Sequence, residues 1–301
     1  MSLLGSLDLR GPAGEPVDFR RLLASHGVAT LAPNSVDLER WTLETTVQLD
    51  GGAESLRISE PEPGVLRVES VSTVRGTKAK QRLLVTARHL LRLDDDLSGF
   101  YARAAEDPAL AWVAAGAGRM LRSQTVFEDV VKTICTTNCS WSATVRMTDA
   151  IVNELGALAP DGRHAFPSPA AMAAAPLSFY ADVVRAGYRG AYLQRLATDV
   201  ADGRLDLEGL SDPALSDLEV EQRLLALPGV GPYAAAHVML TSLGRYGRLI
   251  LDSWTRPKYA RLTGRKAADT TIQRRFRRHG DYAGLAFWMM LTQDWVDDEP
   301  G

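Results

Sequence analysis

The sequence has very little cysteine and no long apolar segment. Its 301 residues include only Cys135 and Cys139, and two thiols so close together exclude a disulfide framework and any four-cysteine zinc or iron–sulfur site. No apolar run approaches the roughly 20 residues of a membrane helix. Residues 1–8 also lack the basic region of an export signal. We therefore expect a protein of the reducing cytoplasm with no membrane partner.

The chain also lacks an overall excess of positive charge. Its formal net charge is −3, but the distribution of charge is more informative than the total. Residues 244–279 contain nine Arg and two Lys against Asp252 and Asp269, which gives a local net charge of +9. Such asymmetry can place a basic face against phosphates while an acidic body keeps the protein soluble. A solvated helical face would carry the same charges, and for the basic run 274–278 solubility is an equally simple explanation.

The hydrophobic period changes along the chain, from strand-like to helical after about residue 79. We expect residues 1–100 to form an α+β N-terminal domain with a small antiparallel sheet, and residues 101–301 to form an all-helical body. The fold class is thus mainly α. The expected strands are 41–49, 56–59 and 65–72, with turns at 50–51 and 61–64. The expected helices are 18–24, 80–91, 97–106, 109–117, 127–155 with a possible break at 138–140, 169–174, 177–186, 188–202, 218–226, 233–243, 255–262, 271–278 and 281–293.

A Gly/Pro-rich segment, Leu-Pro-Gly-Val-Gly-Pro-Tyr at 227–233, separates two apolar-periodic helices. Pro228 ends the first helix, and Pro232 suits the first turn of the second. Gly229 and Gly231 permit backbone angles that a Cβ would forbid and let another backbone come close. Unpaired N–H groups would then converge where a phosphate can bind without any base being read. A plain helix–turn–helix corner is the alternative, but the ordered motif favours DNA.

Asp252 closes an apolar run and opens a helix, 21 residues after Gly231. Taken alone, such an Asp is a helix N-cap. Here one helix and a short apolar segment join it to the hairpin, which would hold a carboxylate close to anchored DNA. Cleavage of an N-glycosidic bond passes through an oxocarbenium-like sugar that a carboxylate stabilises. The base must first leave the stack, so we also expect an aromatic-lined pocket.

Several further segments carry a family resemblance. With the hairpin and the Leu-Asp-Ser-Trp at 251–254, they make the chain resemble the helix–hairpin–helix DNA glycosylases of the endonuclease III superfamily, and most of all the branch of alkyladenine DNA glycosylase II and 8-oxoguanine glycosylase. The resemblance extends from about residue 77 to the end and is only architectural before that. The segments are 93–101, 126–138, 166–169, 227–238 and 282–295.

The resemblance implies a cleft between two helical subdomains, with the helix–hairpin–helix at 218–243 and Asp252 as the catalytic carboxylate. The partner would be double-stranded DNA containing a damaged base, bound by a monomer in the nucleoid. The residues implied to contact DNA are Gly229, Val230 and Gly231 at a phosphate, and Asn138, with Cys139 and Ser140 beside it, in the gap left by the base. The carbonyls of Leu225, Leu227 and Val230 are implied to bind Na⁺ or K⁺.

The chain departs from the bifunctional members of this family at Tyr233, where they carry a nucleophilic Lys. Without an amine there, a Schiff base and the associated lyase step are not expected. The cysteine ligands of the endonuclease III iron–sulfur cluster are absent as well. We therefore expect a monofunctional, hydrolytic glycosylase that requires no cofactor.

Tyr233 and His237 are four residues apart and share one helix face. The resemblance places both in the base pocket, together with His279, Phe287 and Leu291. Phe287 replaces an amide of the oxoguanine branch, and an aromatic surface suits a cationic alkylated purine such as 3-methyladenine. A partly buried structural histidine is the alternative for His237. Removal of mismatched thymine or uracil, removal of another modified base, or non-catalytic binding of distorted DNA are the alternative functions.

Five other residues invite a functional reading but have simpler explanations. Cys135 and Cys139 are more simply packed helix residues than metal ligands. Lys132 is expected to be a solvated lysine and not a displaced nucleophile. Trp254 and Trp295 are expected in the core and not as stacking residues.

Overall fold

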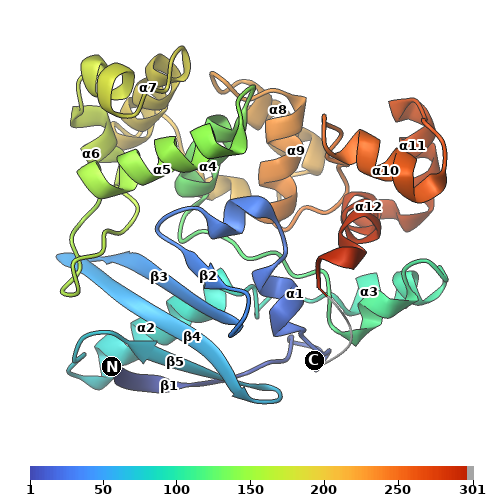
Figure 1. The fold of residues 1–301 in the computed structure, drawn as a ribbon, viewed down its shortest axis with the longest axis horizontal. Coiled ribbons are helices and arrows are strands. Elements are labelled where there is room, and N and C mark those ends of the chain that lie inside the picture. Colours follow the sequence, from blue (N-terminus) through green and yellow to red (C-terminus); the bar gives the residue numbers. More distant parts are fainter. Residues whose placement is uncertain (297–301) are drawn as a thin grey trace.

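The N-terminal part of the chain forms one antiparallel sheet in the computed structural model, which describes residues 1–296. The strand order is β1-β5-β4-β3-β2, as Figure 1 shows at the lower left. The predicted strand at 41–49 and its hairpin at 50–51 are confirmed, since β3 pairs with β4 in register from Thr42 with Ser59 to Leu49 with Gly52. The strands are β1 (Ser2–Asp8), β2 (Ser35–Asp37), β3 (Thr42–Leu49), β4 (Gly52–Glu62) and β5 (Val65–Ser70).

Two strands were not predicted, and both are at the edges of the sheet. β1 contains Gly5 at a register shift against β5, which interrupts the alternation of apolar and polar residues that predicts a strand. β2 has only three residues and pairs only with β3. β4 is longer than predicted and includes Pro61, in the stretch where the register shifts between Ser59 and Glu62. Pro is tolerated at such an irregularity because no ladder hydrogen bond is needed from its nitrogen.

One core lies between the sheet and the helices that cover it. Helix α1 (Phe19–Leu23) begins as predicted at Asp18, whose side chain accepts a hydrogen bond from the Arg21 N–H. Helix α2 (Thr77–Leu90) packs on β1. This core contains residues from Leu4 to Leu93, together with Leu121.

The rest of the chain is helical, so the predicted fold class is confirmed. The predicted helix 127–155 breaks into α4 and α5 at Thr137–Ser140, and the segments 109–117 and 177–186 contain only a short 3₁₀-helix and a π-helical turn. The bounds are α3 (Ser98–Ala105), η2 (Ala111–Ala115), α4 (Val126–Thr136), α5 (Trp141–Leu155), α6 (Pro169–Ala174), η3 (Phe179–Val183), α7 (Arg189–Ala201), α8 (Asp217–Leu225), α9 (Pro232–Thr241), α10 (Thr255–Thr263), α11 (Asp269–Phe276), η5 (Arg277–Tyr282), α12 (Ala283–Thr292) and η6 (Gln293–Trp295). The short helices η1 (Gly27–Thr30) and η4 (Glu208–Ser211) complete the described part.

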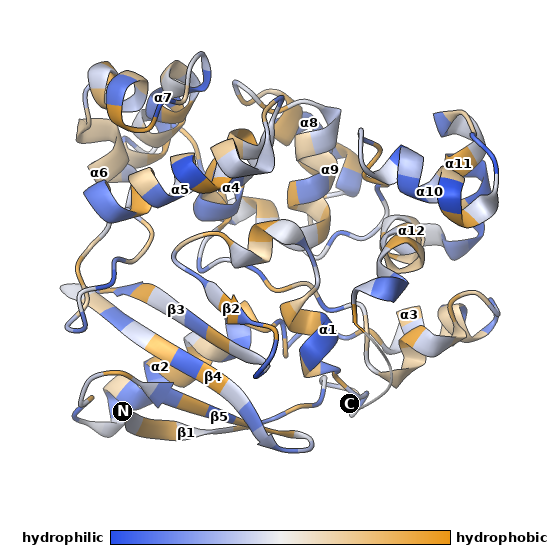
Figure 2. Cartoon of the chain, viewed as in Figure 1, coloured by the Kyte–Doolittle hydropathy of each residue, from blue (hydrophilic) through white to orange (hydrophobic). Residues whose placement is uncertain are grey.

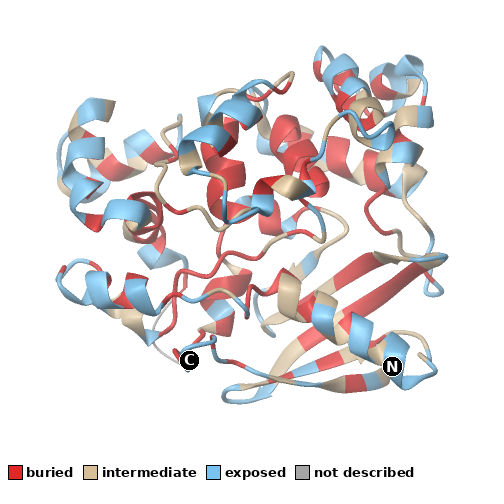
Figure 3. Ribbon diagram, turned by 180° about the vertical axis from the view of Figure 1, so that it is seen from behind, coloured by how far each residue is buried: buried red, intermediate tan, exposed pale blue. Residues whose placement is uncertain are grey.

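The helical part has two cores that meet at helix α9. The first core is built from α4 to α9, and the second from α3, η2 and α10 to α12. Ala234 and Ala235 of α9 belong to the first core, whereas Ala236 and Leu240 belong to the second. Helix α9 is accordingly apolar on every side and α12 similarly so, whereas α10 and α11 are largely hydrophilic (Figure 2). Seen from behind, many of the buried residues lie in the helices at the centre of the molecule (Figure 3).

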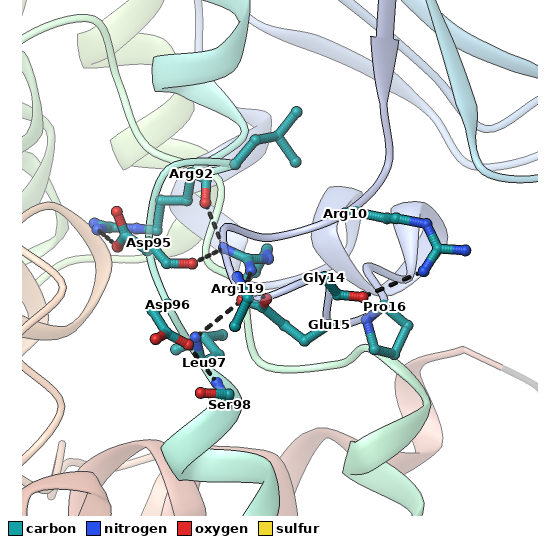
Figure 4. A network of polar contacts seen from close by, with 12 residues as sticks. Arg10, Gly14, Glu15, Pro16, Arg92, Asp95, Asp96, Leu97, Ser98 and Arg119 are labelled. Atoms are coloured by element: carbon teal, nitrogen blue, oxygen red, sulfur yellow. Dashed lines mark hydrogen bonds and ion pairs between the residues drawn. The ribbon is translucent and has the colours of Figure 1, made fainter.

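The segment between the N-terminal domain and the helical body is held by two buried arginines (Figure 4). Arg119 donates to Glu15 Oε1 at 2.6 Å and to the carbonyls of Arg92 and Asp95. The same Glu15 oxygen accepts from the Leu97 N–H at 3.1 Å. Arg92 donates to Asp95 Oδ2 at 2.7 Å and to the carbonyls of Met120 and Thr241. Except for the bond between Arg92 and Asp95, which lie three residues apart, each of these bonds joins different segments of the chain.

We predict that Arg119→Met destabilises the protein by about 3–5 kcal/mol, because Glu15 would be left buried without its charge partner. Urea denaturation followed by circular dichroism measures the change. The control is Arg82→Met, which breaks an ion pair with Asp50 that is exposed on both sides and should leave the midpoint unchanged. Equal midpoints for the two variants would contradict the prediction.

Candidate functional site

A cleft of about 560 Å³ lies between the two helical cores. The end of α4 and the loop that follows it form one wall, and the segment that leads into α10 forms the opposite wall. The hairpin between α8 and α9 forms the floor. The lining residues are Thr136, Thr137, Asn138, Cys139, Tyr188, Gly229, Gly231, Pro232, Tyr233, Ala234, Leu251, Asp252 and Ser253.

The hairpin has the conformation that its glycines predict at one position and not at the other. Gly229 has φ +84°, and a Cβ there would lie 2.9 Å from the Tyr192 ring, so only glycine fits. Gly231 has φ −101°, which any residue adopts. The predicted need for glycine backbone angles at Gly231 is therefore wrong. A Cβ at Gly231 would meet no atom within 4 Å, so this position is an open face that a phosphate backbone can approach.

The hairpin presents N–H groups to the cleft. Its turn is closed by the Val230 N–H, which donates to the Leu227 carbonyl at 3.1 Å, and the Val230 side chain is buried. Helix α9 then begins with Pro232, which has no N–H to leave unsatisfied. The next two N–H groups, of Tyr233 and Ala234, have no acceptor within their own helix. Since the positive end of the helix dipole coincides with these donors, an anion is stabilised there.

The carbonyls of Leu225, Leu227 and Val230 lie around the same turn. Leu225 is the last residue of α8, so its carbonyl has no partner within that helix. The Leu227 carbonyl already accepts one hydrogen bond, from Val230, and retains a second lone pair. Backbone carbonyl oxygens are ligands that a hard monovalent cation accepts, so the cation implied by the resemblance stays a prediction for this turn.

Hydrogen bonds hold the Asp252 side chain in place just before the start of α10. Its Oδ1 atom accepts hydrogen bonds from the N–H groups of Trp254 at 2.9 Å and Thr255 at 2.7 Å, and its own N–H donates to Thr255 Oγ1 at 2.8 Å. Among residues 1–296, Oδ2 has no hydrogen-bond partner. The N-cap residue of α10 is Trp254 and not Asp252, so the N-cap prediction is wrong by two residues. Oδ1 of Asp252 nevertheless binds the first N–H groups at this helix start, and the other oxygen is available to a ligand in the cleft.

Tyr233 stands between Asp252 and the end of α4. Thr136 Oγ1 donates to the Thr133 carbonyl at 2.7 Å, so the Tyr233 hydroxyl is the donor in its 3.2 Å bond to Thr136. Burial raises the pKa of Tyr233, and the charge of Asp252 raises it further. The phenol is therefore neutral, and no amine lines the cleft among the described residues.

Lys132 is the nearest lysine to the cleft along α4, and it is neither solvated nor a nucleophile. Its side chain is fully buried and pairs with Glu128 at 2.7 Å. The predicted solvated position is wrong, because one turn of α4 packs against the N-terminal domain, where Nζ also reaches the Leu31 carbonyl at 3.4 Å. Its amine is already committed to this ion pair.

The loop between α4 and α5 is exposed from Asn138 to Ser140. The expectation that Cys139 is a packed helix residue is therefore wrong, because it lies in this loop and not within a helix. Asn138 has φ +47°, and its amide donates to the Tyr188 hydroxyl at 3.3 Å. The Cys139 thiol turns back to the Cys135 carbonyl, and Ser140 caps α5 by accepting from the Ala143 N–H. Asn138 is thus the one of the three whose side chain reaches across the cleft rim, whereas Cys139 and Ser140 bond within their own loop and helix.

Two residues of this rim were not singled out from the sequence. Tyr188 is 53% exposed, packs against Tyr192, and lies under the Arg189 guanidinium at 4.6 Å. Arg189 donates to the carbonyl and hydroxyl of Thr137, so it fixes the start of the Asn138 loop. The sequence predicts only a helix at 188–202 for this segment. Two aromatic residues beside an Arg, in Tyr-Arg-Gly-Ala-Tyr at 188–192, are the signal that points to a rim of the cleft.

Four predicted pocket residues do not line the cleft. Phe287 and Leu291 are fully buried in the second helical core, where Phe287 packs on Tyr259 and Phe276. Their assignment to an open base pocket is therefore wrong in this structure, because α12 is apolar all round and central. His279 is also buried, 3.5 Å from Asp107. His237 is buried directly behind Tyr233, with ring centroids 5.9 Å apart.

Two tryptophans differ from their prediction as well. Trp254 and Trp295 are each 37% exposed and pack on Trp288 at the surface. Their expected place in the core is wrong because Trp288, whose indole N–H donates to the Ser25 carbonyl, occupies the buried position of this cluster.

The basic segment 244–279 is only partly neutralised. Five of its cations form ion pairs, for example Arg256 with Asp269 and Arg278 with Asp107. Exposed side chains without an ion-pair partner in residues 1–296 are those of Arg261, Arg265, Lys266, Arg274, Arg275 and Arg277. These residues lie on α10, α11 and the turns that adjoin them, beside the segment that carries Asp252, so an unpaired basic surface extends from the cleft.

The fold is shared with solved DNA glycosylases. The chain is similar to a 3-methyladenine DNA glycosylase from Archaeoglobus fulgidus, with a TM-score of 0.74 and 18% identity over 96% of this chain and 97% of that one. It is also similar to an 8-oxoguanine glycosylase/lyase from Clostridium acetobutylicum, with a TM-score of 0.71 and 18% identity over 91% and 92% of the two chains. At such identities the likeness shows the fold, and it confirms at that level the resemblance predicted from the motifs.

A third structure matches a smaller share of the chain. A DNA-3-methyladenine glycosidase from Bacillus halodurans has a TM-score of 0.51 and 20% identity over 65% of this chain and 89% of that one. No protein-family model and no curated protein sequence matches the chain. No helix within residues 1–296 is long and apolar enough to span a membrane.

The buried histidines behind the cleft predict a pH dependence of stability. Burial lowers the pKa of His237 to about 3 and that of His26 to about 4, from 6.5; Asp129 partly opposes the shift at His26, and Arg92 and Lys132 add to it. Below pH 6.5 the unfolded chain binds protons that the folded chain excludes. The free energy of unfolding is therefore highest above pH 6.5. It decreases as the pH falls toward 4 and 3, by about 2 kcal/mol for each imidazole between pH 7 and 5.

Urea denaturation at pH 7, 6 and 5 measures this loss. Burial and the nearby Arg122 also lower the pKa of His89 to about 4, so the variant His237→Gln should retain about two thirds of the pH dependence that His26, His89 and His237 give the wild type. Identical slopes for the two proteins over this range would contradict the prediction.

Proposed function

We propose that the protein is a monofunctional DNA glycosylase that hydrolyses the N-glycosidic bond of a damaged base in double-stranded DNA. The observation that carries this proposal is the arrangement in the cleft. The unpaired oxygen of Asp252, the donor groups of the hairpin and the neutral Tyr233 line one cavity, and no amine accompanies them. The proposal also includes action as a monomer, without a required cofactor, on chromosomal DNA in the cytoplasm.

Binding to DNA would rest on two surfaces. The N–H groups at the start of α9 and the open face at Gly231 hold one backbone phosphate, and the cation at the carbonyls of the hairpin would support that turn. The unpaired basic side chains of α10 and α11 add phosphate contacts that depend on salt. On the opposite rim, Asn138 and the exposed ring of Tyr188 are placed to fill the gap left by an everted base, since an aromatic ring stacks on any base.

The chemistry would take place at Asp252. As the bond between C1′ and the base nitrogen breaks, the base leaves with the bonding electrons and positive charge develops on the sugar. The unpaired Oδ2 stabilises this charge. A water molecule oriented by the same carboxylate adds to C1′ and transfers one of its protons to the Asp252 carboxylate. Capping of α10 by Oδ1 keeps the carboxylate in place throughout, because reorientation would break two backbone hydrogen bonds.

An alkylated purine such as 3-methyladenine is the proposed substrate. Alkylation makes the base cationic and a good leaving group, so little help from an acid is needed. The Tyr233 ring offers the aromatic surface that attracts such a cation. Phe287 is buried in the second helical core and does not line the cleft, so it gives no argument for or against an oxidised guanine. Two of the structures with this fold also carry 3-methyladenine glycosylase or glycosidase in their names.

We predict that Asp252→Asn reduces base excision at least 100-fold, because a neutral amide retains the cap but not the charge that stabilises the sugar cation. Duplexes that each contain one lesion are incubated with the protein, and abasic sites are counted after alkali. The panel includes alkylated purines, T·G, U·G and 8-oxoguanine. The matched control is Asp269→Asn, an exposed aspartate paired with Arg256, which should excise normally. Failure of the wild type on every lesion would leave only a DNA-binding role.

The absence of an amine in the cleft predicts that no covalent intermediate forms. Reduction with borohydride during turnover should trap no complex between the wild-type protein and DNA, because Tyr233 cannot form a Schiff base with the sugar. Gel electrophoresis after reduction detects such a complex. A trapped species that disappears in Lys132→Met would instead show that this buried amine reaches the sugar.

A further inference from the structure

Two hydroxyl groups meet in the wall of the cleft. Thr136 comes from the last turn of α4 and Tyr233 from the first turn of α9, and both residues line the cavity. Their hydroxyl oxygens are 3.2 Å apart. Both side chains are half-buried, so a ligand in the cleft can reach them without movement of the wall.

The end of α4 fixes the direction of the Thr136 proton. In a helix that continued, the Thr137 N–H would donate to the Thr133 carbonyl. Here the chain leaves the helix at Thr137, and its N–H donates to the Ile134 carbonyl at 3.2 Å instead. The Thr136 hydroxyl takes the vacant place and donates to the Thr133 carbonyl at 2.7 Å. Because Thr133 is buried, rotation of that hydroxyl would leave a buried carbonyl without a donor, which is costly.

The Tyr233 hydroxyl is consequently the donor in the bond between the two hydroxyls. Burial holds the pKa of Tyr233 above its usual range, although the bond to Thr136 opposes the shift, so the phenol keeps the proton that it donates. A threonine oxygen has two lone pairs, and the phenolic proton occupies one of them. The second lone pair of Thr136 has no hydrogen-bond partner among residues 1–296.

Other side chains of the same wall also direct their protons away from the cleft. The Thr137 hydroxyl and the Cys139 thiol donate to carbonyls of α4, those of Ile134 and Cys135. Asp252, on the opposite wall, contributes only a carboxylate oxygen. The atoms that surround the Tyr233 ring therefore accept hydrogen bonds, and a ligand that lies on this ring has to supply the donors.

We propose that the free lone pair of Thr136 selects the everted base, by accepting a hydrogen bond from an exocyclic amine while the base stacks on the Tyr233 ring. The proposal rests on the glycosylase function proposed above and specifies its substrate class as purines that carry such an amine. The hydroxyl edge of the ring points at Thr136. A base that overlaps the ring and extends its amine beyond that edge meets Thr136 Oγ1 and leaves the ring in place.

The same arrangement rejects bases without an amine at that edge. A carbonyl oxygen there would meet the lone pair of Thr136. It could accept the Tyr233 proton only by removing that proton from Thr136, so no hydrogen bond would be gained. A methyl group or a C–H would exclude water from Thr136 and leave its oxygen unsatisfied. Sites built to pair with an N–H discriminate strongly against analogues that lack it.

The test measures the binding of three free bases to the whole chain by isothermal titration calorimetry. Adenine carries the amine, 6-methylpurine has the same shape without an N–H at that position, and 6-methoxypurine presents an acceptor. The wild type should bind adenine about tenfold more tightly than either analogue, which is the effect of about one hydrogen bond. A wild type that binds none of the three, or binds them equally, would overturn the proposal.

Three variants of the hydroxyl pair separate recognition from packing. Thr136→Val should abolish the preference for adenine over 6-methylpurine. It also frees the Tyr233 proton, so 6-methoxypurine should become the tightest ligand, whereas a packing defect would weaken all three bases alike. Thr136→Ser keeps the acceptor and Tyr233→Phe keeps the ring, and both should retain the preference for adenine. Retention of the preference in Thr136→Val, or its loss in either of the other two variants, would overturn the proposal.

The matched control is Thr198→Val. The Thr198 hydroxyl also donates to a carbonyl of its own helix, that of Gln194 in α7, at 2.8 Å, and this residue does not line the cleft. The control should bind the three bases as the wild type does.

The outcomes for recognition and for catalysis are independent. A preference for adenine that depends on Thr136, in a protein that excises no lesion, would support this role of Thr136 and refute the glycosylase. Excision of alkylated purines without that preference would support the glycosylase and refute this role of Thr136.

Discussion

The structure depends on two arginines that are completely withdrawn from water. A buried guanidinium is costly unless most of its donors are satisfied. Here the Glu15 and Asp95 carboxylates and the backbone carbonyls of three different segments accept from the two arginines, and Arg119 Nε is left without a partner among the described residues. Arg119 binds Glu15 of the N-terminal domain, whereas Arg92 reaches the Thr241 carbonyl at the end of α9. A Cβ at Gly11 would lie about 2 Å from the Glu15 carboxylate and Arg119. The network therefore also requires glycine where the chain passes next to these two side chains.

This network also holds helix α9, the helix at which the two helical cores meet. At its carboxyl end, Arg92 places a positive charge where the helix dipole and the free carbonyls favour one. Burial alone would raise the pKa of Asp95, but Arg92 outweighs it and lowers that pKa, so the ion pair stays charged. The amino end of the same helix presents the hairpin N–H groups. One helix therefore binds Arg92 at one end and presents N–H groups without an acceptor in their own helix to the cleft at the other.

Local signals predicted the elements that local chemistry decides. The Asp18 cap, the break at 138–140 and the hairpin between α8 and α9 are each encoded within a few residues, and the structure confirms them. Strands β1 and β2 were missed because they depend on pairing with distant segments. The burial of Lys132, Phe287 and Leu291 was missed for the same kind of reason: exposure on a helix depends on what packs against it, and their neighbours are far away in sequence.

The cleft combines residues that no single segment could reveal. Asp252 and the hairpin were predictable because 21 residues and one helix link them. Their partners on the other wall, Thr136 and Tyr188, come from α4 and from the start of α7. The sequence therefore predicts the Asp252 side of the cleft better than the opposite wall. A carboxylate one helix away from a Gly/Pro-rich turn is a local arrangement, whereas the opposite wall depends on segments that are far away in sequence and come together only in the folded chain.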